Sequence, residues 1–169
     1  MYARFIVFLL IFIPLTIQSA HTYEHILIPT ITLPEITVRP VNQTDKELIA
    51  RLIRSEDCNQ GLLSNMIIAQ TVLHKTKKYN TDVYGAIFKT YSRGKAYYGA
   101  YTDNFNKKPL EVHYEAAEMV LKGYRPAPEG IAYFIGANDN PNTSWYKYIE
   151  KYAWKQVGYH VYCFDPKYK

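Results

Sequence analysis

The sequence predicts an α+β domain that is mainly helical and ends in a small antiparallel β element. Apolar residues recur at helical spacing through much of residues 44–123. Two strand-like runs come later, "IAYFIG" at 131–136 and "VGYHVYCF" at 157–164, with the turn-forming "NDNPNTS" between them. The chain has 169 residues, and the 149 that follow the first 20 suit one domain, which would bury about 70% of its unfolded surface.

Residues 1–20 have the layout of a secretory signal peptide. Arg4 precedes an apolar run over residues 5–13, and two small residues close the segment. The run is too short for a membrane-spanning helix, which needs about 20 residues. We therefore expect export to the periplasm, the cell envelope or the extracellular space. Because Gln18 stands where a small residue is preferred, an uncleaved membrane anchor is the alternative.

Residues 21–43 predict an extended linker. Its prolines forbid a helix, and its β-branched residues favour extended chain. His21 and His25 have a spacing that could hold a metal on a helix, but this segment is not helical and no third ligand is evident. We expect no metal and no cofactor, and membrane contact only through residues 1–20 if they are not cleaved.

The folded domain is expected to span residues 44–169 and to begin with three helices. Thr44 and Glu47 have the spacing of a capping box at the start of the first helix. Residues 61–79 are apolar around most of the helix circumference, which predicts a central buried helix. A short helix is expected at 82–89.

A polar segment separates these helices from the next one. Residues 90–109 are irregular, with Gly94 and Gly99 as hinges, and predict a long surface loop of the kind that is often functional. Residues 110–123 predict an amphipathic helix that ends at a glycine. His113 lies on its apolar face, and we interpret it as a core residue.

The charge is mildly basic, at +5 with a pI of about 9.0. The densest basic run, "KTKK" at 75–78, is interpreted as a solvated helix end. A basic exported protein could meet an anionic polymer such as a cell wall, and we expect no nucleic-acid partner. The 17 tyrosines could bind carbohydrate through their rings or simply pack against strands and surfaces.

Cys58 and Cys163 are the two cysteines. In an exported chain they could form a disulfide, and two buried thiols are the alternative. The sequence contains no glycine-rich phosphate loop, no Cys-x-x-Cys pair and no G-x-S-x-G motif.

Glu56 stands on the apolar face of the first helix. At 100° per residue, with Ile49 at zero, Leu52 falls at about 300°, Ile53 at about 40° and Glu56 at about 340°. Desolvation there would raise the pKa of the carboxyl, which suits a general acid that cleaves a glycosidic bond. Alternatively, the helix frays before Glu56 and the side chain reaches solvent.

The run "ELIARLIRSEDCNQGLLSNMIIAQTVLHKT" is similar to the opening of the SleB-type cell wall hydrolases, in which a helix ends in a catalytic glutamate and a buried helix follows. Four further stretches resemble the family in the same order: "VYGAIFK", "EAAEMVLKGYRP", "IAYFIGANDNPNTSW" and "VGYHVYCF". The resemblance covers residues 46–164. His74 replaces the usual asparagine, Asp57 and Cys58 follow the glutamate in place of the usual residues, and a glutamine of the family's loop is unmatched.

The resemblance implies a lysozyme-like fold and cleavage of peptidoglycan glycan strands between N-acetylmuramic acid and N-acetylglucosamine. Glu56 matches the catalytic position, and family members look like lytic transglycosylases, which leave an anhydro sugar. No second carboxylate is well placed in the sequence, although Asp103 is a possible one. We therefore favour a single glutamate acting first as acid and then as base, and attack by water stays open.

The resemblance and the sequence together point to substrate-binding residues, with Tyr98, Tyr133, Asn138 and His160 as the candidates. Structural roles are the alternative for the last three. We expect a monomer that binds peptidoglycan. A non-catalytic wall-binding or structural module on the same fold is the main competing hypothesis, because of "EDC" and the missing glutamine. A metal-dependent amidase is disfavoured by the spacing of the histidines.

Overall fold

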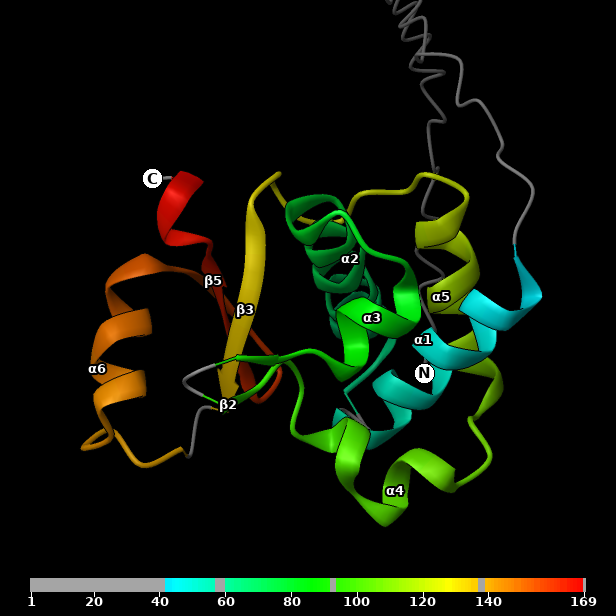
Figure 1. The fold of residues 1–169 in the computed structure, drawn as a ribbon, viewed down its shortest axis with the longest axis horizontal. Coiled ribbons are helices and arrows are strands. Elements are labelled where there is room, and N and C mark those ends of the chain that lie inside the picture. The colour runs from blue at the N-terminus through cyan, green and yellow to red at the C-terminus, as the bar shows by residue number, and fades with distance from the viewer. Residues whose placement is uncertain (1–41, 57–59, 92–93, 137–138, 169) are drawn as a thin grey trace, which may run out of the picture. The chain divides into compact units, whose positions relative to one another are not determined.

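The computed structural model describes residues 42–56, 60–91, 94–136 and 139–168 (Figure 1). The predicted signal peptide, most of the predicted linker, Asp57, Cys58 and Asn138 lie outside these residues. The described part consists of a group of helices, a three-stranded antiparallel sheet and a short two-stranded hairpin. The expected α+β class with a small antiparallel element is therefore confirmed.

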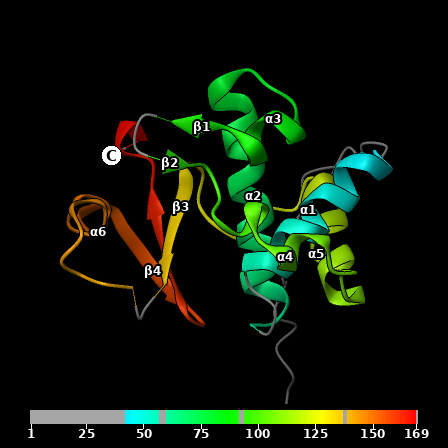
Figure 2. The ribbon, with the colours of Figure 1, turned by 60° about the horizontal axis from the view of Figure 1, so that its bottom comes forward.

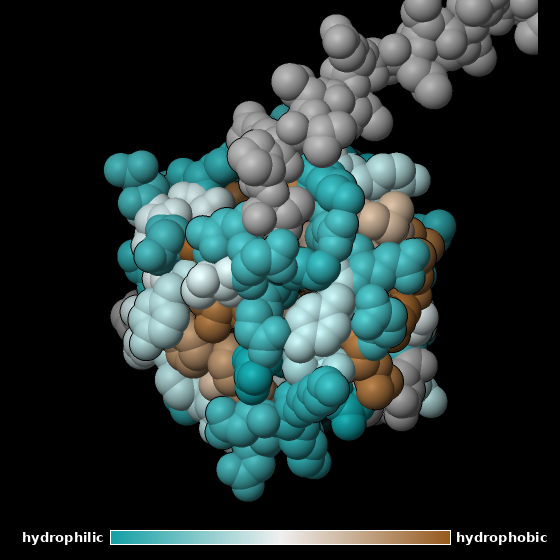
Figure 3. Space-filling view, turned by 90° about the vertical axis from the view of Figure 1, so that its right-hand side faces the viewer, coloured by the Kyte–Doolittle hydropathy of each residue, from teal (hydrophilic) through white to brown (hydrophobic). Residues whose placement is uncertain are grey.

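The long helix α2, Leu62–Tyr79, lies at the centre of the helical part, between α1 and the sheet (Figures 1 and 2). Its side chains are buried around most of its circumference, as the sequence predicts. Helices α1 (Gln43–Glu56) and α5 (Glu111–Leu121) pack together on one side of the domain. The face over these two helices is mainly hydrophilic, with separate apolar patches (Figure 3).

The first helix begins at Gln43, two residues before the start that an N-cap at Thr44 predicts. The side chain of Asn42 accepts hydrogen bonds from the backbone N–H groups of Thr44 and Asp45, at 2.9 and 3.4 Å. Asn42 therefore caps the helix, and the predicted capping box of Thr44 and Glu47 is wrong. The carboxylate of Glu47 instead accepts a hydrogen bond from Arg51 at 2.6 Å.

The described residues of 90–109 contain more regular structure than the predicted surface loop. They contain a small hairpin, β1 (Thr90–Tyr91) and β2 (Gly94–Lys95), a 3₁₀ turn at Gly99–Tyr101 and the short helix α4, Asp103–Asn106. Three apolar side chains, Tyr97, Ala100 and Phe105, are buried in the core. These three buried side chains hold the segment against the helices. The short helix α3 (Val83–Phe88) precedes the segment in the chain.

The sheet has the strand order β3–β5–β4, with β3 at Ile131–Gly136, β4 at Ala153–Val157 and β5 at His160–Phe164. The prediction of two strands is wrong, because "VGYHVYCF" contains the end of β4, a turn and β5. Gly158 makes this turn possible, since its φ of 61° lies in the left-handed region. Helix α6, Ser144–Ile149, lies in the connection between β3 and β4.

Tyr162 fixes the sheet to the central helix. Its side chain is fully buried, and its hydroxyl lies 2.7 Å from the Ser64 hydroxyl of α2. The same hydroxyl donates to the backbone carbonyl of Ser64 at 3.1 Å. The pairing of Phe134 with Tyr162 and of Gly136 with His160 then sets the register of β3 on β5.

None of the helices in the described segments combines the length and the apolar character needed to cross a membrane. The same residues contain no group of three or more histidine, cysteine, aspartate or glutamate side chains arranged to hold a metal ion.

Candidate active site

A cleft of about 970 Å³ lies between the helical part and the sheet. Its lining comes from α1, α2, β2 and the segment after it, β3, α6 and β5 with the residues that follow. Four of the predicted site residues line it: Glu56, Tyr98, Tyr133 and His160. The volume lies within the range of about 300–1,000 Å³ that is typical of ligand sites.

Glu56 is the last residue of α1 and is half-buried. Ile49, Leu52 and Ile53 on the same helix face are fully buried, so the apolar stripe continues to the end of the helix. The helix does not fray before Glu56. One carboxylate oxygen, Oε1, accepts a hydrogen bond from the backbone N–H of Gly99 at 2.6 Å.

Gly99 leaves the space that the Glu56 carboxyl group occupies. A Cβ atom at position 99 would lie 2.8 Å from the Cδ and Oε1 atoms of Glu56 and 2.7 Å from the hydroxyl of Ser55. Gly99 does not have a positive φ, so the missing side chain matters for close approach rather than for turn geometry. The interpretation of Gly99 as a hinge is therefore wrong, because the glycine is needed for close packing against Glu56.

Lys75 is a cleft residue that the sequence analysis missed. Its side chain lines the cleft although the residue is only 2% exposed. The Nζ atom donates to the carbonyl oxygen of Ala96 at 3.2 Å and lies 3.6 Å from the centre of the Tyr97 ring. Burial lowers the pKa of Lys75 to about 7, against the opposing effect of the Glu56 carboxylate.

Lys78 also lines the cleft and forms an ion pair with Asp165. It donates a further hydrogen bond to the hydroxyl of Tyr133 at 3.2 Å. Burial alone would lower the pKa of Lys78, but these two hydrogen bonds outweigh burial and raise it. The basic run at 75–78 is therefore not the solvated helix end that the sequence suggested, because only Lys77 of its three lysines is exposed.

Aromatic rings form much of the remaining wall. Tyr98 is 76% exposed, whereas Tyr133 is half-buried. The Tyr133 ring meets the edge of Trp145 at 5.5 Å between ring centres, and Trp145 lies 6.2 Å from Tyr148. Burial raises the pKa of Tyr133 to about 12. Trp145 and Tyr148 were not predicted as site residues. The closely spaced aromatic residues in "SWYKYIEKY" were the sequence feature that could have indicated them.

His160 is an uncharged wall residue at neutral pH. It is 7% exposed and packs against Phe134 at 4.8 Å and Tyr162 at 5.9 Å between ring centres. Burial lowers its pKa to about 4, against the weaker opposing effect of Asp139. An imidazole with this pKa can hydrogen-bond a ligand but carries no charge near pH 7.

The other candidates lie elsewhere. Asn138 and Cys58 are outside the described residues, and Cys163 is fully buried in β5, so the disulfide stays a prediction. Asp103 is exposed on α4 and is not part of the cleft lining, so it is no longer a candidate second acid. His113 is buried in the core, where its ring accepts a hydrogen bond from the N–H of Leu110 at 3.1 Å.

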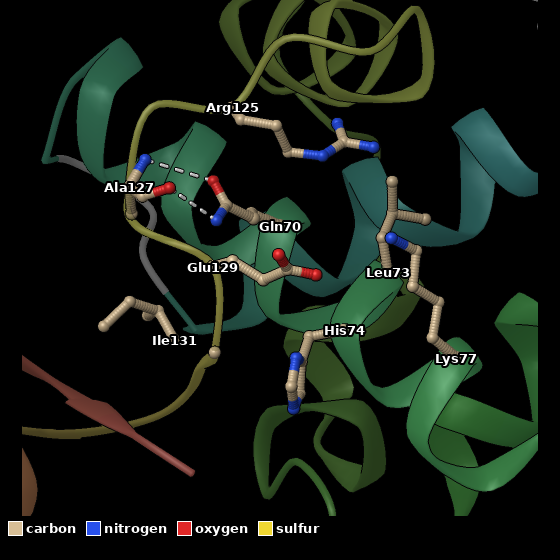
Figure 4. Close-up of a pocket in the computed structure, with 9 residues that line it drawn as sticks. Gln70, Leu73, His74, Lys77, Arg125, Ala127, Glu129 and Ile131 are labelled. Carbon is tan, nitrogen blue, oxygen red and sulfur yellow. Dashed lines mark hydrogen bonds between the residues drawn. The ribbon is translucent and has the colours of Figure 1, made fainter. Parts of the chain in front are cut away.

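A second, smaller cavity of about 260 Å³ borders the opposite face of α2 (Figure 4). One of its polar lining residues, Gln70, is already paired, because its side chain exchanges two hydrogen bonds with the backbone of Ala127, at 2.8 and 3.1 Å. None of the predicted site residues lines it. The larger cleft is therefore the better candidate for an active site.

The fold has clear counterparts among solved structures. The catalytic domain of the germination-specific lytic transglycosylase SleB from Bacillus anthracis matches with a TM-score of 0.60 and 18% identity, over 74% of this chain and 98% of that one. The catalytic domain of SleB from Bacillus cereus matches with a TM-score of 0.59 and 21% identity, over 78% and 98%. No protein-family profile matches the sequence, and no curated protein matches it significantly.

The chain therefore has the fold of the SleB catalytic domains, as the sequence motifs predicted.

Proposed function

We propose that the protein cleaves the glycan strands of peptidoglycan between N-acetylmuramic acid and N-acetylglucosamine, with Glu56 as the catalytic residue. The observation that carries the proposal is the half-buried carboxyl group of Glu56 in a large cleft, oriented by the Gly99 N–H. The SleB-like fold and the aromatic wall support it, since sugar rings pack well against aromatic faces. In this proposal residues 1–20 export the protein to the wall.

The proposed reaction needs one protein carboxyl group. Protonated Glu56 donates its proton to the glycosidic oxygen, the bond from that oxygen to C1 of the muramic acid breaks, and the glucosamine leaves with a free 4-hydroxyl. The Glu56 carboxylate then takes the proton of the 6-hydroxyl, whose oxygen bonds to C1. The product is a 1,6-anhydro sugar, no water is consumed, and Glu56 ends protonated as it began.

Of the other two carboxylates that line the cleft, Asp165 is poorly suited to support attack by water, and Asp139 stays open as a base for that route. Asp165 is 1% exposed and accepts hydrogen bonds from Lys78, from the N–H of Lys167 at 3.1 Å and from His74 at 3.3 Å. A carboxylate enclosed in this way is poorly suited to activate water. Asp139 is exposed, and its Oδ2 accepts from the N–H of Gly136 at 2.7 Å.

Mass spectrometry of digested peptidoglycan tests the proposal. The wild-type protein should release soluble muropeptides with anhydro ends, and Glu56→Gln should release none while it still binds walls. If the wild type instead releases fragments with reducing ends, and Asp139→Asn releases none, the reaction is hydrolysis rather than the anhydro route. Binding of walls by the wild type without any release would leave the non-catalytic wall-binding module as the function, and equal release by wild type and Glu56→Gln would remove Glu56 from the mechanism.

A further inference from the structure

The amino group of Lys75 is fixed in the wall of the cleft. It is held by the carbonyl oxygen of Ala96 at 3.2 Å and by the face of the Tyr97 ring at 3.6 Å. The ring is itself fixed, because its hydroxyl lies 2.7 Å from that of Thr71, which donates to the carbonyl of Ile68 at 2.8 Å. Lys75 therefore has little freedom to move its head group away from the cleft.

Lys75 and Glu56 line the same cleft and are held by the same short segment, because Lys75 donates to the carbonyl oxygen of Ala96 at 3.2 Å and Glu56 accepts from the N–H of Gly99 at 2.6 Å. The ionisable groups that act on Lys75 are Glu56 at the end of α1, Lys78 on α2 and Asp165 after β5, while the rings of Tyr97 and Tyr133 lie 3.6 and 5.4 Å from its Nζ atom.

Two of these charges are paired with each other. Lys78 and Asp165 are bound in an ion pair and act on Lys75 in opposite directions. Glu56 is the other carboxylate that acts on Lys75, and its charge favours the ammonium form of the lysine. Charges of opposite sign interact more strongly around a buried amine such as that of Lys75, which is 2% exposed, than in bulk water.

We propose that Lys75 is a positioning residue for Glu56: its amino group controls the charge of the Glu56 carboxyl, so that the two side chains gain and lose protons as a coupled pair. The proposal extends the function given above. When Glu56 has donated its proton and a sugar fills the cleft, the ammonium of Lys75 stabilises the carboxylate until it recovers a proton from the 6-hydroxyl.

The coupling has a definite sign in each direction. The negative charge of Glu56 favours the ammonium form of Lys75, so loss of that charge should make Lys75 release its proton at lower pH. The positive charge of Lys75 favours the carboxylate form of Glu56, so loss of that charge should make Glu56 keep its proton to higher pH. Strongly coupled groups of this kind titrate as a pair.

NMR titration of the full chain tests the coupling without any assay of activity. The Lys75 side chain is followed by its 13Cε and 15Nζ signals in wild type and in Glu56→Gln, and the Glu56 carboxyl carbon in wild type and in Lys75→Met. We expect the Lys75 midpoint to fall by about one pH unit or more in Glu56→Gln, and the Glu56 midpoint to rise in Lys75→Met. Midpoints that stay unchanged in both variants would overturn the proposal.

The pH dependence of wall cleavage separates this inference from the proposed function. If Glu56 acts as a general acid, Lys75→Met should move the alkaline limb of the activity profile to higher pH, and Lys75→Arg, which keeps a permanent charge, should move it to lower pH. Lower activity with an unmoved profile in both variants would mean a merely structural role. A protein that shows the NMR coupling but cleaves no walls would refute the proposed function and leave the coupling intact.

Discussion

Replacement of Lys75 by methionine should stabilise the protein at and below neutral pH. The folded state holds Lys75 in a buried site that lowers its pKa from 10.5 to about 7, whereas the unfolded chain leaves the amine in water. Below pH 7 both states carry the proton, and the folded state bears the full cost of the buried charge. As the pH rises from 7 to 10.5 the folded state loses its proton first, and this cost disappears.

The size of the effect follows from the two pKa values. A lowering from 10.5 to about 7 corresponds to about 5 kcal/mol of lost stability at pH 6, at about 1.4 kcal/mol per pKa unit. Methionine removes this cost but leaves the carbonyl of Ala96 without its donor, at a cost of about 2 kcal/mol. The variant should therefore be more stable than wild type by about 3 kcal/mol at pH 6, with the gain falling to about zero near pH 9.

Urea unfolding of both proteins from pH 6 to pH 10 measures the effect. Lys77→Met is the matched control, because Lys77 is two residues away on the same helix and exposed, so its stability difference from wild type should be small and independent of pH. The reasoning fails if Lys75→Met is less stable than wild type at every pH, or if its difference from wild type is the same at pH 6 and pH 9.

Three further results are expected. Gly99→Ala should fold but lose most of its activity, because its Cβ would displace the carboxyl group of Glu56. Circular dichroism would measure the fold of the variant, and release of peptidoglycan fragments would measure its activity. His160→Phe should make the protein less sensitive to acid. In the wild type the buried imidazole is protonated as the pH falls from 6.5 to 4, which lowers the free energy of unfolding by roughly 3 kcal/mol. Similar acid unfolding curves for the two proteins would contradict this reasoning. Trp145→Ala should raise KM by about five- to tenfold with little change in kcat, and an unchanged KM would remove this ring from the binding wall.

The helices were predictable because their burial follows the sequence period. In α1 the fully buried Ile49, Leu52 and Ile53 recur at helical spacing, and the same period places Glu56 on that face. Strand β4 was missed for the opposite reason. Its sequence "AWKQV" is mostly exposed, and its apolar and polar residues do not alternate as they do in a half-buried strand.

The candidate site was only partly predictable because its contacts join distant parts of the chain. The sequence pointed to Glu56, Tyr98, Tyr133 and His160, and all four line the cleft. The hydrogen bond from Gly99 to Glu56 spans 43 residues, and no local pattern indicates it. Lys75 was overlooked because a run of lysines at a helix end is usually solvated.

Lys75 and Lys78 show why a lysine must be judged by its neighbours rather than by its place in a basic run. They lie one helical turn apart, yet the pKa of Lys78 is raised by the hydrogen bond to Asp165, whereas that of Lys75 is lowered to about 7 by burial. Methionine would fill the Lys75 site without a buried charge. A cost of about 5 kcal/mol is large for a domain whose net stability is about 5–15 kcal/mol, and costs of this kind are typical of functional sites. Lys75 lines the same cleft as the proposed general acid, where an amine that titrates near pH 7 can respond to the charge of Glu56 and an amine held in an ion pair cannot.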